Sequence, residues 1–161
     1  MTTKTAVDIT IERIEQVLGD NPAFAKVDES FYVVRQGSAY VYIRVLPWEP
    51  ERALVRLVAQ LVGGVEITPD LTMRLLRANT RLRFGAFGFV PQGSCVILTH
   101  TLLGGASLGE EELLTALRTL AVMADEYDDA IVEVAGGKRM QDLLDDSAAA
   151  ALLEAMAARS G

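Results

Sequence analysis

Valine-rich runs joined by tight turns constrain the fold of this chain more than any other feature of its sequence. Residues 31–36 and 39–45 are rich in Val, Ile and Tyr, and only Gly and Ser separate them, a connection suited to a tight hairpin. Residues 84–90 and 95–102 form a second pair around a Pro-Gln-Gly-Ser turn. Strands joined by hairpins are antiparallel, so the sequence predicts an antiparallel sheet.

A third run, residues 54–62, follows the first pair and fits two periodicities. Its leucines and valines satisfy a helical spacing, but every second residue from Val55 to Leu61 is apolar and faces away from Arg56 and Gln60. Valine enrichment favours the extended conformation. We therefore expect a strand at residues 54–62.

Helical signals lie on either side of these strands. An apolar stripe from Val7 to Leu18 predicts a first helix. Thr68-Pro69-Asp70 supplies an N-cap, a proline and an early acid for a second helix ending near Asn79. Ser107 and Glu110 have capping-box spacing, which predicts a third helix running at least to Tyr127.

The predicted order of elements is α-β-β-β-α-β-β-α. It corresponds to an α+β fold in which helices cover one face of an antiparallel, five-stranded sheet. We expect one domain over residues 1–145. The segment from Lys138 onward has high helix propensity, and residues 146–161 are expected to form a helical tail that frays or docks.

Composition and charge exclude several classes of function. The formal charge of −7 repels phosphate backbones and anionic lipids, so we expect neither nucleic acid nor a membrane as partner. Cys95 is the single cysteine, so no intramolecular disulfide can form. The N-terminus lacks the apolar core of a signal peptide, and we expect a cytoplasmic protein.

The residue pairs most suggestive of catalysis favour structural roles. Cys95 and His100 are five apart on one predicted strand and so point to opposite faces. The acidic cluster from Asp125 to Asp129 lacks the spacing of a calcium loop and is expected at a solvated helix end. Gly136-Gly137-Lys138 lacks the other residues of a phosphate loop and is expected to end a helix.

Aromatic and basic residues suggest protein contacts instead. Tyr40, Tyr42 and Arg44 share one face of the second predicted strand and Trp48 follows them, and these residue types are enriched at interfaces. Burial beneath the C-terminal helix is the competing interpretation.

A basic stripe offers a second candidate surface. Arg74, Arg77 and Arg81 lie at helical spacing, with Arg83 just beyond. They form either a solvated face with local ion pairs or a docking strip for acidic peptide segments.

A family resemblance is carried by the run LTMRLLRANTRLRFGAFGFVPQGSCVILTHTLLGG together with SLGEEELLTALRTLAVMAD. Residues 7–135 resemble the YbjN family, whose domains are similar in fold to type III secretion chaperones (CesT/Tir chaperone-like). The resemblance implies a dimeric, non-catalytic module that holds extended peptide segments without a cofactor. Phe87 and Phe89 would contribute dimer contacts in such a fold, although an ordinary core position is their simpler role.

The sequence therefore predicts a non-enzymatic, homodimeric, chaperone-like or regulatory adaptor protein that binds a protein or peptide client and needs no cofactor or metal. Apolar contacts and strand addition would hold the client. Two alternatives remain open: a metal-dependent enzyme or metal-binding module built from Asp125 to Asp129 and His100, and a structural subunit of a larger complex.

Overall fold

The computed structural model describes residues 3–145 and 158 of the 161-residue chain. Its elements, in chain order, are α1 (Ala6–Leu18), β1 (Phe24–Asp28), β2 (Phe31–Gln36), β3 (Ala39–Trp48), β4 (Arg52–Gly63), α2 (Pro69–Asn79), β5 (Ala86–Val90), β6 (Cys95–Leu103), the short 3-10 helix η1 (Gly105–Ser107), α3 (Glu110–Ala135), β7 (Lys138–Arg139) and α4 (Met140–Asp145).

The strands form one antiparallel sheet in the order β1-β2-β3-β4-β6-β5, and β7 pairs with the end of β4. The prediction of an antiparallel sheet is confirmed, but the sheet has seven strands and the predicted five is wrong. β1 was missed because Lys26 and Asp28 interrupt its apolar pattern. β7 is two residues long and lies where the sequence predicted helix.

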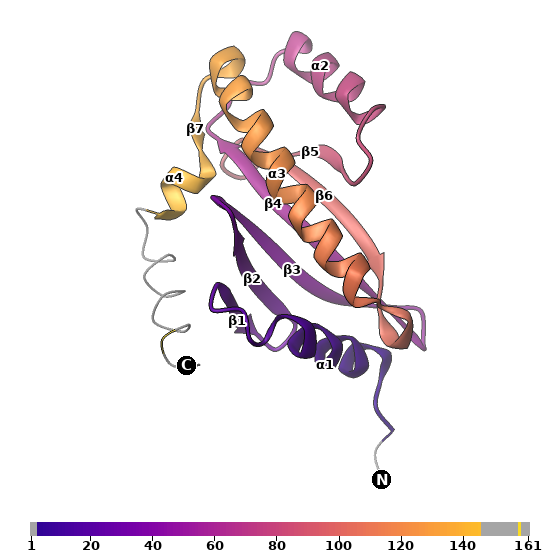
Figure 1. The fold of residues 1–161 in the computed structure, drawn as a ribbon. Helices are drawn as coiled ribbons and strands as arrows, with labels where there is room; N and C mark the ends of the chain where they lie inside the picture. Colours follow the sequence, from indigo (N-terminus) through magenta and orange to yellow (C-terminus); the bar gives the residue numbers. More distant parts are fainter. Residues whose placement is uncertain (1–2, 146–157, 159–161) are drawn as a thin grey trace.

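Helices α1 and α3 lie across the same face of the sheet, and α2 lies beyond its β5 end (Figure 1). We call the side that α1 and α3 cover the covered face and the opposite side the open face. α1 begins at a capping box in which Thr5 and Asp8 bond each other's backbone N–H. α2 begins as predicted, with the Thr68 hydroxyl accepting from the N–H of Leu71.

The hydrophobic core lies between the covered face and the helices. Ile43 and Leu57 from the sheet and Leu117 and Leu120 from α3 are at most 1% exposed. Burial of each such side chain contributes about 1.5–3 kcal/mol. The alternation predicted for β3 is present, because Val41, Ile43 and Val45 all face this core.

β4 is the central strand, which resolves the ambiguous run at residues 54–62. It pairs with β3 along one edge and with β6 along the other, with a bulge between Gln60 and Val62. An isolated stretch of this composition fits either periodicity, but pairing on both edges satisfies its backbone as a strand.

The start of α3 corrects one prediction. Ser107 is not the N-cap: it belongs to η1, and Gly109 occupies the cap position with no side-chain bond. Three glutamates, Glu110 to Glu112, instead fill the first turn, where the helix dipole favours negative charge.

The end of α3 lies beyond the predicted minimum. Gly136 and Gly137 follow Ala135 with φ values of 70° and 84°, a region that only glycine adopts without strain. The predicted terminator is therefore present. The helix expected from Lys138 is wrong at its start, because β7 comes first and α4 begins at Met140. The predicted tail, residues 146–161, lies outside the described residues except for residue 158.

Candidate functional site

The open face combines aromatic, aliphatic and arginine side chains. In an antiparallel pair, residues directly opposite each other lie on the same side, so the register places Phe31 of β2 beside Arg44 of β3, and Arg44 beside Arg56 of β4. Around them lie Tyr42, Leu46, Trp48, Leu54 and Leu103.

Exposure on the open face increases toward the β3–β4 hairpin. Arg44 and Arg56 are exposed, Trp48 is 40% exposed and Leu103 is 56% exposed, whereas Tyr42 is half-buried. A surface with large apolar groups uncovered beside cations is typical of an interaction site.

Stacked contacts hold the aromatic side chains of this face in place. The rings of Phe31 and Tyr42 stack with centroids 5.6 Å apart, and the Arg44 guanidinium lies 4.5 Å from the Phe31 ring centre. The Arg52 guanidinium lies 5.8 Å from the Trp48 ring centre. Burial raises the pKa of the Tyr42 hydroxyl, so at neutral pH it remains protonated and can donate a hydrogen bond.

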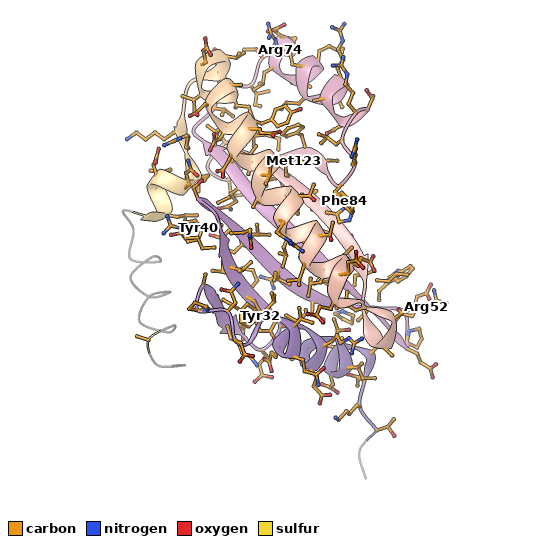
Figure 2. All side chains as sticks on the ribbon, viewed as in Figure 1. Tyr32, Tyr40, Arg52, Arg74, Phe84 and Met123 are labelled. Atoms are coloured by element: carbon orange, nitrogen blue, oxygen red, sulfur yellow. The ribbon has the colours of Figure 1, made fainter. Side chains whose placement is uncertain are left out.

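Tyr40 differs from the other three predicted contact residues of β3. It is 5% exposed, and the Arg35 guanidinium lies 5.4 Å from its ring centre. It lies near α4, at the opposite end of β3 and β4 from Arg52 (Figure 2). Tyr40 is therefore buried in this structure. It could contact a partner only if the α4 end of the open face opened.

A second apolar surface lies between α2 and β5. We call it the α2–β5 surface and define it by the exposed side chains of Ile67, Met73, Leu76 and Phe89. A depression of about 150 Å³ lies between Leu76 and Phe89. Asn79 joins the two elements, because its side-chain oxygen accepts from the N–H of Phe87 at 2.6 Å.

The two predicted phenylalanines have different environments. Phe87 is 8% exposed and its ring meets the ring of Tyr127 edge-on at 5.0 Å, so it belongs to the core. Phe89, two residues on, is 41% exposed and belongs to the α2–β5 surface.

The predicted basic stripe divides into two parts. Arg74 donates to Asp70 at 2.8 Å, a local ion pair. Arg77 is an exposed residue of the last turn of α2. Arg81 and Arg83 line a depression of about 510 Å³ together with Arg118 and Glu126 of α3.

Cys95 and His100 do not form a catalytic pair. His100 is opposite Leu57 on the covered side of β6, and its Nδ1 accepts from the N–H of Gly85 at 3.0 Å. Burial lowers the pKa of His100 and raises that of the Cys95 thiol. The raised pKa keeps Cys95 a neutral thiol, which is the inert form for nucleophilic attack.

The acidic cluster lies inside α3, which corrects its expected place at a helix end. Asp125 accepts from Ser38, Asp129 pairs with Arg139, and Asp128 is 3% exposed with a pKa raised chiefly by burial. Among the described residues, no group of three or more His, Cys, Asp and Glu side chains is arranged to hold a metal ion.

The sequence of this chain matches the model of a known protein family. A family model described as "T3SS (YopN, CesT) and YbjN peptide-binding chaperone 1" (TY-Chap1) matches residues 4–143. The chain belongs to this family. The match spans the sheet, α1, α2, α3 and most of α4, so it includes both apolar surfaces.

A solved structure shows the same fold. A chain in the crystal structure of the ExsC–ExsE complex is 21% identical and superposes with a TM-score of 0.61, and the similarity covers 80% of this chain and 97% of that one. No curated protein sequence matches this chain. In the part of the chain that the structure describes, no helix is both long and apolar enough to cross a membrane.

Sequence reasoning missed five members of the open face: Phe31, Leu46, Leu54, Arg56 and Leu103. Period-two alternation assigns each to one side of its own strand. It does not give the register, and only the register shows that Arg56 lies directly opposite Arg44.

Proposed function

We propose that this protein is a peptide-binding chaperone-like adaptor that holds an extended segment of a client protein against its open face, and that it needs no cofactor. The observation that carries the proposal is the uncovered, aromatic and aliphatic surface around Tyr42, Arg44 and Trp48. Membership of a peptide-binding chaperone family supports it.

The chemistry of the open face suits a polypeptide better than a small molecule. Its side chains spread over β2, β3, β4 and β6. Broad apolar contact with a few anchoring Tyr, Trp and Arg residues is how protein interfaces gain affinity.

The two sheet edges differ in their capacity for strand addition. The edge strand β1 contains Lys26 and Asp28 and a register shift, features that discourage pairing. The edge strand β5, Ala86–Val90, contains no charged residue. On the outer edge of β5, however, the Asn79 side chain already bonds both the N–H and the carbonyl oxygen of Phe87. An added strand would have to displace Asn79, so the proposal places the client on the side chains of the open face.

We propose in addition that two copies associate through the α2–β5 surface. Leu76, Met73 and Phe89 are apolar and from 41% to 55% exposed, which is unfavourable unless another apolar surface covers them. These side chains belong to α2 and to the covered side of β5, so their association leaves the open face to the client. The homodimer predicted from the sequence has its best-supported interface here.

A peptide selection experiment tests the client site. Peptides are selected from a random display library on the purified protein, and their affinities are measured by fluorescence anisotropy for the wild type, Tyr42→Ala and Trp48→Ala. We expect each variant to bind at least about tenfold more weakly, the loss typical of an anchoring aromatic residue. Val122→Ala, at a position 56% exposed on α3, is the matched control and should bind like the wild type.

Unchanged affinity in both aromatic variants, with folding verified by thermal melting, would exclude the open face as the site. Light scattering tests the dimer separately. Leu76→Glu should convert the protein to a monomer, and a monomeric wild type would end the dimer proposal without affecting the client site.

A further inference from the structure

Charge is segregated between α3 and the strands β2 to β6. Strands β2 to β6 contain Arg35, Arg44, Arg52 and Arg56 and no Asp or Glu, although the whole chain has a formal charge of −7. α3 has the opposite character, because it carries acidic residues along its length and a single arginine, Arg118. The part of the open face formed by β2 to β6 is therefore a basic surface on an acidic protein, while Asp28 of β1 lies beside Phe31 at its edge.

Two arginines define the centre of this basic surface. Arg44 and Arg56 lie directly opposite each other on β3 and β4, and both are exposed. Phe31 flanks Arg44 on one side and Thr101 flanks Arg56 on the other. We call Arg44 and Arg56 the arginine pair.

The arginine pair differs in its partners from several other arginines of the chain. Arg52 pairs with Glu49, Arg74 with Asp70, and Arg139 with Asp129 and Asp142. Neither Arg44 nor Arg56 forms an ion pair with a carboxylate in residues 3–145. The guanidinium of Arg44 instead makes a cation–π contact with the Phe31 ring. Like charges directly opposite on a sheet repel each other.

We infer that the arginine pair recognises an acidic residue of the client, so that the open face selects segments in which Asp or Glu is flanked by apolar residues. This inference rests on the proposed function. A carboxylate between two guanidinium groups accepts hydrogen bonds from both and removes their repulsion. Leu46, Leu54 and Leu103 form the neighbouring row on the hairpin side of the pair and provide the apolar contacts.

The geometry also sets the expected pattern in the client. Side chains of an extended segment alternate between its two sides, so the acidic residue and the apolar residues that face the sheet are two positions apart. The sequence selected should therefore alternate, with an acidic residue at the centre of the side that faces the protein.

Parallel selections test this inference. Random peptides of about 12 residues, longer than one ordinary strand, are selected on the wild type and on the Arg44→Gln/Arg56→Gln double variant. We expect acidic residues between apolar ones to be enriched on the wild type only. Arg74→Gln is the matched control, because it removes an arginine that already has a partner, and it should select the same peptides as the wild type.

One selected peptide is then compared with its Glu→Gln version. The acidic form should bind the wild type at least about tenfold more tightly, and its affinity should fall as salt is raised from about 50 to 500 mM. In the double variant the two forms should bind alike. Arg44→Lys/Arg56→Lys, which keeps the charge and loses the planar geometry, should retain part of the preference.

The outcomes separate this inference from the proposed function. Selection of apolar peptides without acidic residues on the wild type, or equal acidic enrichment on the double variant, overturns the inference and leaves the client site intact. Selection of no peptide at all contradicts the proposed function. Loss of dimerisation in the double variant would show that a second copy of this acidic protein occupies the pair, which also overturns the inference.

Discussion

The two faces of the sheet are built from alternate residues of the same strands and differ in almost every property. On β3, Ile43 and Val45 are at most 2% exposed beneath the helices, while Arg44 between them is exposed. The covered face consists mainly of aliphatic side chains in contact with α1 and α3. The residues of the covered face therefore specify the fold, and those of the open face are available for contact with a partner.

Truncating one leucine on each face is the strongest test of this division. Leu57 is 0% exposed on the covered face, so Leu57→Ala should lower the free energy of unfolding by about 2–5 kcal/mol. Leu54, half-buried on the open face, should lose less than about 1 kcal/mol on the same change. Urea unfolding measures both, and equal losses would show that the open face is part of the folding core.

A hydroxyl group tests how far the covered face depends on polar contacts. Tyr32 is 0% exposed and donates to Glu15 of α1 at 3.0 Å. Tyr32→Phe should cost about 1 kcal/mol at neutral pH. Tyr127→Phe is the control, since no hydrogen bond of its hydroxyl is found within the described residues.

The cost of Tyr32→Phe should depend on pH. The hydrogen bond from Lys26, followed by that from Tyr32, lowers the pKa of Glu15 below its unfolded value of about 4.3. Stabilisation by the charged carboxylate is complete above that value and is lost as the pH falls through the folded pKa. The difference in unfolding free energy between wild type and Tyr32→Phe, measured by urea unfolding, should therefore narrow below about pH 4. A difference that does not change with pH would mean that the variant loses packing and not the hydrogen bond to the carboxylate.

The smallest expected effect concerns the arginine pair. Arg56→Gln removes the repulsion with Arg44 and should stabilise the free protein slightly, by no more than about 0.5 kcal/mol at low salt. Added salt should reduce the gain. Arg74→Gln should instead cost up to about 0.5 kcal/mol, because it breaks an ion pair within α2. A large loss of stability on Arg56→Gln would mean that this arginine stabilises the sheet.

The sequence predicted the elements whose periodicity is long and regular. α1, α2 and strands β2 to β6 follow from the spacing of their apolar residues and from the turns that bound them. β7 escaped because two residues cannot establish a period, and β1 escaped because Lys26 and Asp28 interrupt its apolar pattern. Ser107 was misassigned because its spacing to Glu110 satisfies the capping box, while the chain forms η1 at that point.

The candidate site was predictable only in part. Tyr42, Arg44 and Trp48 followed from alternation within one strand, but the pairing of Arg44 with Arg56 depends on register between strands. Burial of Tyr40 near α4 depends on tertiary packing, which strand periodicity does not encode. The same limit applies to Phe87, which an edge-on contact with Tyr127 of α3 places in the core.

The central position of β4 has a consequence for biosynthesis. Its partner β3 precedes it across a short hairpin, whereas its other partner, β6, follows only after α2 and β5. A chain emerging from the ribosome can thus complete the β1–β4 meander while one edge of β4 and its apolar covered face still lack β6 and α3. This interval, which ends when β6 has paired with β4 and α3 has packed on the sheet, is when the nascent chain is most exposed to aggregation.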